Sequence, residues 1–212
     1  MKHRGAWVAC AIALSILAPQ TADACGRIRR PRPRQVDRKL AAVKKSEALL
    51  AKGKHKAAAK VARGKFRGFQ AATGEADHGK ALFNRAQRTI ALATIRSEGA
   101  IDLGKGMRGR SSDSKALNLA WATSVLEIQA ASDPDNLVLR TNYAEALTHH
   151  PGGDAQALEM LSEMANDDLM PTARGFVLLA TVQQSLGDAS GSDLSLQRCK
   201  ELGATANVCR VA

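Results

Sequence analysis

From residue 37 onward, apolar and small residues recur at the three- and four-residue spacing of an α-helix, and glycine or proline interrupts the pattern at short intervals. No sustained two-residue alternation, which would indicate strands, competes with it. We therefore predict an all-α fold of about eight short helices, which must stack because helices of this length are marginal alone. Three predicted buried faces show the spacing most clearly: Ala42, Val43, Ser46, Leu49 and Leu50; Leu117, Ala120, Trp121, Ser124, Val125 and Ile128; and Ala157, Leu158, Leu161, Met164 and Ala165.

The predicted helix ends coincide with residues that stop helices. Glycine exposes the backbone and proline lacks the amide donor, so both end helices more often than they continue them. The breaks are predicted at Gly53, Gly64, Gly68, residues 99–109, Asp133-Pro134, residues 151–153, Pro171 and Gly187.

Small residues have a repeated spacing around two of these breaks. Ser46, Gly53 and Ala58 stand seven and then five residues apart, and Ala180, Gly187 and Ser192 repeat that spacing. The link at residues 133–136 places proline where one helix ends and Asn or Asp where the next can be capped.

This pattern resembles the tetratricopeptide repeat, a pair of antiparallel helices that recurs about every 34 residues. The resemblance is strongest over residues 113–199 and implies a short right-handed solenoid of antiparallel helix pairs. Other stacked helix pairs and helical bundles remain open alternatives. In the repeat family the first helices line an extended groove, which makes Arg140 and Asn142 candidates for a ligand-binding groove.

Residues 1–24 have the three zones of a secretory signal peptide. Lys2 and Arg4 supply the positive charge, residues 7–18 the apolar stretch, and residues 22–24 the small-residue cleavage site. The apolar stretch is shorter than the ~20 residues that cross a membrane, and no later segment approaches that length. The sequence therefore predicts an exported protein, periplasmic or extracellular, with no transmembrane span after cleavage.

Export also affects how the cysteines are interpreted, because thiols outside the cytosol tend to be oxidised. Cys199 and Cys209 are close enough in sequence to join the last helix to the C-terminal tail, and we predict a disulfide between them. Cys25 directly follows the predicted cleavage site. It is a candidate lipidation site, which would make the protein an outer-membrane-anchored lipoprotein, although residues 19–23 differ from a lipoprotein signal and favour ordinary cleavage.

Charge is unevenly distributed after residue 24. Residues 25–110 contain 23 Lys and Arg against 6 Asp and Glu, a net charge of +17, whereas residues 111–212 contain 6 against 13, a net charge of −7. Residues 25–36 form an Arg/Pro-rich arm predicted to be disordered, because the alternating prolines disfavour a helix. We thus expect four regions: the signal peptide, this arm, a basic helical region at residues 37–110 and an acidic repeat region at residues 111–212.

The basic region predicts contact with an anionic partner, because clustered Lys and Arg attract polyanions and anionic surfaces. Export makes an anionic lipid or polysaccharide of the cell envelope a better candidate than nucleic acid, and the scarcity of aromatic residues for base stacking agrees. The residues expected to make this contact are Arg29, Arg30, Arg32, Arg34, Lys52, Lys54 and Lys56.

No catalytic or metal-binding arrangement stands out. No serine lies within a glycine elbow, no histidine or acid has the position of a proton relay, and His149 and His150 are adjacent and so cannot share a metal on one helical face. We predict no cofactor and no enzymatic activity. The sequence favours a binding scaffold or adaptor at the bacterial cell envelope for an unidentified protein or peptide, and the alternative is a structural protein that self-assembles through its oppositely charged halves.

Overall fold

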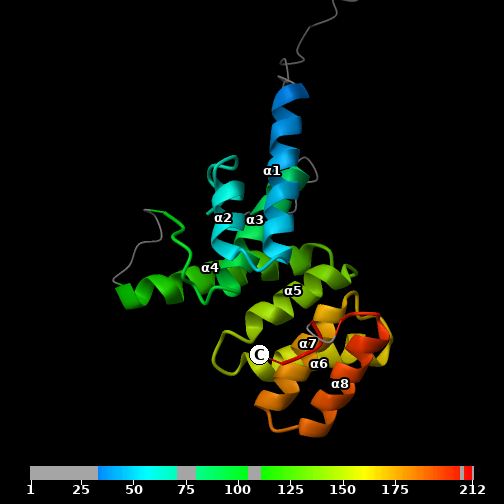
Figure 1. Ribbon diagram of the computed structural model, residues 1–212. Coiled ribbons are helices and arrows are strands. Elements are labelled where there is room, and N and C mark those ends of the chain that lie inside the picture. The colour runs from blue at the N-terminus through cyan, green and yellow to red at the C-terminus, as the bar shows by residue number, and fades with distance from the viewer. Residues whose placement is uncertain (1–32, 71–79, 105–110, 206–207, 212) are drawn as a thin grey trace, which may run out of the picture. The chain divides into compact units, whose positions relative to one another are not determined.

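The computed structural model describes residues 33–70, 80–104, 111–205 and 208–211 (Figure 1). These residues form helices and no strand, so the all-α prediction is confirmed for this part of the chain. None of the described helices is long and apolar enough to cross a membrane. The helices are α1 (Pro33–Ala51), α2 (His55–Arg63), α3 (Ala81–Ile95), α4 (Ser111–Ser132), α5 (Leu137–Leu147), α6 (Gly153–Asn166), α7 (Ala173–Ser185) and α8 (Ala189–Glu201).

Helix α1 begins inside the arm that the sequence predicted to be non-helical. Its first residue is Pro33, so residues 33–36 of the predicted arm are helical. Proline is tolerated in the first turn of a helix because the amide that it lacks would have no intrahelical acceptor there. Pro33 therefore marks the start of the helix and does not exclude residues 33–36 from it. The predicted signal peptide and the rest of the arm lie outside the described residues.

Side chains cap three of the helices in the acidic half. The Asn136 side chain accepts a hydrogen bond from the Leu139 amide at the start of α5, as the predicted link at residues 133–136 implied. Thr172 caps α7, and Asp188 caps α8 by accepting from the Gly191 amide at 2.9 Å. Each cap satisfies an amide that has no partner inside the helix, which fixes where the helix starts.

The two stretches with the spacing of small residues form tight helix–turn–helix pairs. Ser46 and Ala58 are fully buried where α1 packs on α2, and Gly53 in the turn between these helices has a φ of 69°. Ala180 and Ser192 are buried in the same way where α7 packs on α8, with Gly187 at a φ of 85°. A left-handed backbone favours glycine, and small side chains let the two helices approach closely.

From α1 to α8, each helix packs against the next one along the chain. In addition, α1 packs on α3 and α3 contacts α5, so helices two apart in sequence lie side by side (Figure 1). This arrangement places α3 against both α1 and α5. A pocket described below is lined by residues of α1, α5 and α7.

The buried residues form two hydrophobic clusters. The first extends from Val43 of α1 to Leu126 of α4 and includes Ala146 of α5, and the second extends from Ala144 of α5 to Cys209. Helix α5 therefore contributes to both clusters. The change from basic to acidic sequence at residues 110 and 111 does not coincide with a boundary in packing, because α4 belongs to the first cluster together with α1, α2 and α3.

Helix α4 buries a face that matches the predicted one only in part. Trp121 and Val125 are buried as expected and Ser124 and Ile128 are half-buried, but Leu117 is 46% exposed and Ala120 is exposed too. Asn118 and Gln129 are buried instead, because their amides donate to backbone carbonyls: Asn118 to Gly99 and Ile101, and Gln129 to Asn84. A pattern of apolar residues alone does not reveal polar side chains that are buried to satisfy a neighbouring backbone.

Candidate binding pocket and basic groove

A pocket of about 580 Å³ opens where the end of α1, the middle of α5 and the start of α7 meet. Leu50 and Ala51 of α1 line one side, and Val138, Thr141 and Asn142 of α5 line the next. The remaining wall comes from residues 171–178 around the start of α7 and from Val208 near the C-terminus. The lining thus combines segments that are far apart in sequence, and most of it comes from the odd-numbered helices.

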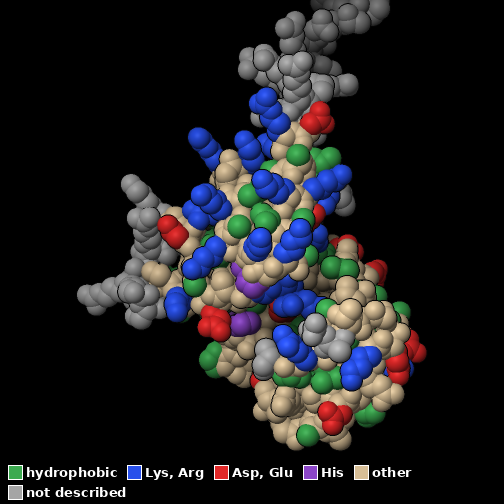
Figure 2. Space-filling view, in the orientation of Figure 1, with side chains coloured by type: hydrophobic (Ala, Val, Ile, Leu, Met, Phe, Trp, Pro, Cys, Tyr) green, Lys and Arg blue, Asp and Glu red, His purple; other side chains and the backbone are tan. Residues whose placement is uncertain are grey.

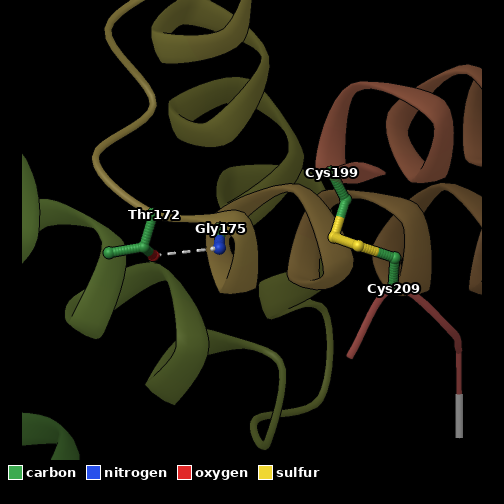
Figure 3. Close-up of a disulfide and its surroundings, with 4 residues drawn as sticks. All are labelled: Thr172, Gly175, Cys199 and Cys209. Carbon is green, nitrogen blue, oxygen red and sulfur yellow. Dashed lines mark hydrogen bonds between the residues drawn. A yellow bond between two sulfur atoms is a disulfide. The ribbon is translucent and has the colours of Figure 1, made fainter. Parts of the chain in front are cut away.

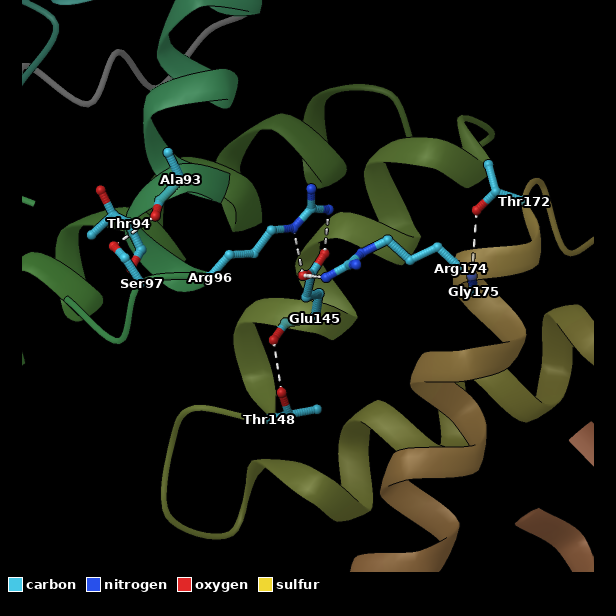
Figure 4. Close-up of polar contacts among 9 residues, drawn as sticks. All are labelled: Ala93, Thr94, Arg96, Ser97, Glu145, Thr148, Thr172, Arg174 and Gly175. Carbon is cyan, nitrogen blue, oxygen red and sulfur yellow. Dashed lines mark hydrogen bonds and ion pairs between the residues drawn. The ribbon is translucent and has the colours of Figure 1, made fainter. Parts of the chain in front are cut away.

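One buried carboxylate holds three helices together at the back of this pocket. The Glu145 side chain on α5 is 8% exposed and accepts two hydrogen bonds from Arg96, which follows α3: Nε donates to Oε1 at 2.7 Å and Nη2 to Oε2 at 2.8 Å. Arg174 of α7 donates from Nη2 to Glu145 Oε1 at 2.6 Å (Figure 4). The two arginines come from opposite sides, so a single side chain links α3, α5 and α7.

The charge state of Glu145 follows from this geometry. Burial by itself would raise the pKa of the carboxyl, but the hydrogen bonds and positive charges of Arg96 and Arg174 outweigh burial and lower the pKa from 4.5 to about 2. The group is therefore ionised at neutral pH. Beside it, burial and the charges of the same two arginines lower the pKa of His55, which keeps this histidine neutral at pH 7.

The two predicted groove residues have different surroundings. Asn142 lines the pocket, and its side-chain amide makes no hydrogen bond with another residue that the structure describes. Arg140, two residues earlier on α5, does not line the pocket, and its Nη2 donates to Glu163 Oε2 of α6 at 2.6 Å. Of the two residues, Asn142 thus lies in the pocket and Arg140 pairs with α6, and contact of either residue with a ligand stays a prediction.

The rest of the pocket is largely aliphatic. Val138 and Val208 are 45% and 51% exposed, and the half-buried Val177 and Leu178 line the same pocket as Thr172 and Arg174. Exposed aliphatic side chains beside a free amide can take up one apolar side chain and pair with a peptide backbone. The pocket therefore has the chemistry to hold a short segment of another polypeptide.

The C-terminal wall of the pocket is attached by a disulfide. Cys199 of α8 and Cys209, the predicted pair, are bonded, with Cα atoms 5.7 Å apart (Figure 3). Both cysteines are buried in the second hydrophobic cluster. Val208 adjoins Cys209, so the bond that joins the tail to α8 also positions one of the pocket residues.

The residues predicted to contact an anionic partner are only partly described. Lys52, Lys54 and Lys56 are exposed at the turn between α1 and α2 and at the start of α2. Arg34 lies in α1, and nothing is described of its side chain; Arg29, Arg30, Arg32 and Cys25 lie outside the described residues. Figure 2 shows that the described Lys and Arg side chains gather over α1 and α2.

Two hollows in this basic surface were not predicted from the sequence. One, of about 750 Å³, lies along α2 and the connection that follows it, and the other, of about 570 Å³, lies between that connection and the start of α1. They share Gly64, Phe66 and Arg67 in their linings, so they adjoin one another, and we call the two hollows together the basic groove. The signal that could have indicated it is the helical spacing of Lys56, Lys60 and Arg63.

Among the described residues, no group of three or more His, Cys, Asp or Glu side chains could hold a metal ion. No protein-family model, curated protein or solved structure matches this chain.

Proposed function

We propose that this protein is an exported, tetratricopeptide-like binding scaffold at the bacterial cell envelope, which holds a short segment of a partner protein in the pocket between α1, α5 and α7. Its basic N-terminal region contacts anionic partners. The observation that carries the proposal is the pocket itself, which gathers its lining from α1, α5 and α7, three helices that are far apart in sequence.

The packing order supports the repeat-like part of the proposal. Two helix pairs, α1 with α2 and α7 with α8, have buried small residues on both helices and a left-handed glycine in the turn. Stacked helix pairs bury a continuous core and leave one series of helices free to line a ligand surface. Contact of α3 with both α1 and α5 is consistent with such a series.

The Glu145 network supports the binding part. A pocket binds best when its walls are already in place, because ordering them on binding costs free energy. Ion pairs from Glu145 to Arg96 and Arg174 hold the α3, α5 and α7 walls in position before any ligand arrives. Asn142, on the same helix as Glu145, is the group most available to pair with a ligand backbone.

Selection of a displayed random peptide library on the oxidised protein tests this proposal. We expect enriched peptides with an aliphatic anchor residue, and we expect Val138→Arg to weaken their binding at least about tenfold, because the new charge fills an apolar wall. Asn142→Ala should weaken binding by about fivefold, which corresponds to one hydrogen bond of about 1 kcal/mol.

Leu194→Arg is the matched control. Leu194 is also an exposed aliphatic residue on a helix, at 64% exposure, but it lies on α8 away from the pocket. Peptides should bind this variant as tightly as the unaltered protein. The proposal fails if no peptide is enriched, or if the enriched peptides bind Val138→Arg and the unaltered protein equally.

A further inference from the structure

The charged residues that line the basic groove are almost all positive. In the part along α2, Lys56, Lys60, Arg63 and Arg67 line the groove. In the part beside α1 the lining includes Arg38, Lys39 and Lys65. None of these seven forms an ion pair with another residue that the structure describes, and Asp102 is the one acidic residue among the described lining residues.

The series of positive charges on α2 destabilises the helix when it is considered alone. Lys56, Lys60 and Arg63 are spaced by four and three residues, so they lie on one side of α2, where like charges repel one another. The two that lie in the last turn, Lys60 and Arg63, gain from the negative end of the helix dipole. That gain does not extend to Lys56, nor to Arg67 beyond the helix end, so a bound anion would relieve the repulsion within this series.

Buried aromatic rings position two of the cations. Lys39 Nζ lies 5.6 Å from the centre of the Phe66 ring, and the Arg63 guanidinium lies 5.6 Å from the centre of the Phe69 ring. Both rings are at most 5% exposed and belong to the first hydrophobic cluster. The faces of fixed rings attract cations, so these two charges are held above the groove floor before a ligand binds.

The same features fit other anionic ligands less well. Nucleic acid bases would be favoured by exposed rings to stack on, whereas Phe66 and Phe69 are buried and Phe83 is half-buried. A lipid bilayer would be favoured by exposed large apolar side chains, and none of those on the described surface lines the groove. A single phosphate is bound best at a helix N-terminus, whereas α2 ends in the groove with its C-terminus.

A peptide is also a poor fit, because it would need free amides to pair with its backbone. Among the described lining residues the one amide side chain is that of Gln70, and its Nε2 already donates to the Leu103 carbonyl at 2.9 Å; the backbone carbonyl of Gln70 accepts from Trp121 Nε1. The ligand class that fits best is therefore a long anionic chain, which is recognised by its charges alone.

We propose that the basic groove binds a strand of acidic polysaccharide, which carries carboxylate or sulfate groups along its length. This inference rests on the part of the proposed function in which basic residues contact an anionic partner, and it gives that contact a site and a ligand class. Of the residues singled out from the sequence, the site includes Lys56 alone.

The test is the affinity of the full-length oxidised protein for a fluorescent oligogalacturonate, measured by fluorescence anisotropy at low and at high salt. Lys60→Gln with Arg67→Gln removes two groove charges and should weaken binding about 30-fold, at about 1 kcal/mol per cation. Lys44→Gln with Lys45→Gln is the matched control, because both lysines are exposed on α1 outside the groove and the net charge changes equally. It should weaken binding no more than about threefold, through long-range attraction that salt screens.

The proposal is overturned if the two double variants weaken binding equally, because net charge would then explain it. It is also overturned if polyglutamate, a single-stranded oligonucleotide or vesicles with anionic lipids bind more tightly than the oligogalacturonate, or if anisotropy rises only because the protein self-associates, which sedimentation would show. Peptides selected on the pocket should bind the Lys60→Gln, Arg67→Gln variant normally. Loss of polysaccharide binding with peptide binding intact, or the reverse, separates this inference from the scaffold proposal.

Discussion

Replacing Glu145 with glutamine tests whether one buried carboxylate holds α3, α5 and α7 together. The substitution keeps the size of the side chain and removes its charge, so Arg96, whose side chain is 14% exposed, loses its anionic partner. Breaking a buried ion pair on one side is strongly destabilising, because the remaining charge stays in a poorly solvated place. We expect the loss of stability to be large for a single isosteric change.

The magnitude follows from the pKa of Glu145. A fall from 4.5 to about 2 on folding corresponds to about 3 kcal/mol at neutral pH, at about 1.4 kcal/mol per pKa unit. Because the folded-state pKa is the lower one, this stabilisation is complete above pH 4.5 and is lost as the pH falls toward 2. For a chain of this length, about 3 kcal/mol lowers the melting temperature by about 6–12 °C.

Urea unfolding followed by circular dichroism, at a series of pH values from neutral to acidic, measures this effect. The unaltered protein should have a higher free energy of unfolding than Glu145→Gln at neutral pH, and this difference should shrink as the pH falls below 4.5. Glu163→Gln is the matched control, because Glu163 also pairs with an arginine, Arg140, but is 58% exposed, and exposed pairs contribute at most about 1 kcal/mol. A Glu145→Gln variant within about 0.5 kcal/mol of the unaltered protein at pH 7, or a difference that does not shrink at low pH, would refute the reasoning.

Two further changes test the disulfide and a close backbone contact. Replacing Cys199 and Cys209 with serine should lower the free energy of unfolding by about 2–3 kcal/mol, because the bond closes a loop with a sequence separation of 10; the variant's urea midpoint should not respond to a reductant, whereas that of the unaltered protein should fall. Gly99→Ala should cost more than about 3 kcal/mol, because the added Cβ would lie 2.5 Å from the Lys115 carbonyl oxygen of α4. Gly203→Ala has a similar φ with no atom within 4 Å of the new Cβ, so it should cost only about 1 kcal/mol, and equal losses for the two alanines would contradict the proposed contact.

Much of the fold could be predicted from the sequence because its signals are local. The glycine and proline breaks at Gly53, Pro171 and Gly187 lie between helices in the structure, and the face of α6 from Ala157 to Met164 is buried as its spacing indicates. The prediction was only partly right for α4, where Trp121 and Val125 are buried but the buried amides of Asn118 and Gln129 take the place of the exposed Leu117. Apolar periodicity identifies a buried face only when the buried residues are apolar.

The candidate sites were harder to predict because they depend on contacts that are distant in sequence. Glu145 pairs with Arg96 and Arg174, which are 49 and 29 residues away, and nothing in the sequence around any of the three marks the pairing. Arg140 is a second example, because it pairs with Glu163, 23 residues away in sequence, and does not line the pocket. The basic groove had a local signal in the spacing on α2, but the prediction placed most of the anionic contact in the Arg/Pro-rich arm, which precedes the groove residues in the sequence.

The disulfide has a consequence for the order in which the pocket is built. Val208 forms part of the pocket wall, and its neighbour Cys209 is joined to α8 by the disulfide. The other walls come from helices that can pack without any covalent bond, but this one is tied to α8 only after two thiols have been oxidised. A reduced molecule can thus pack its helices before this wall is fixed, so the redox state of one bond decides when the pocket takes its final form.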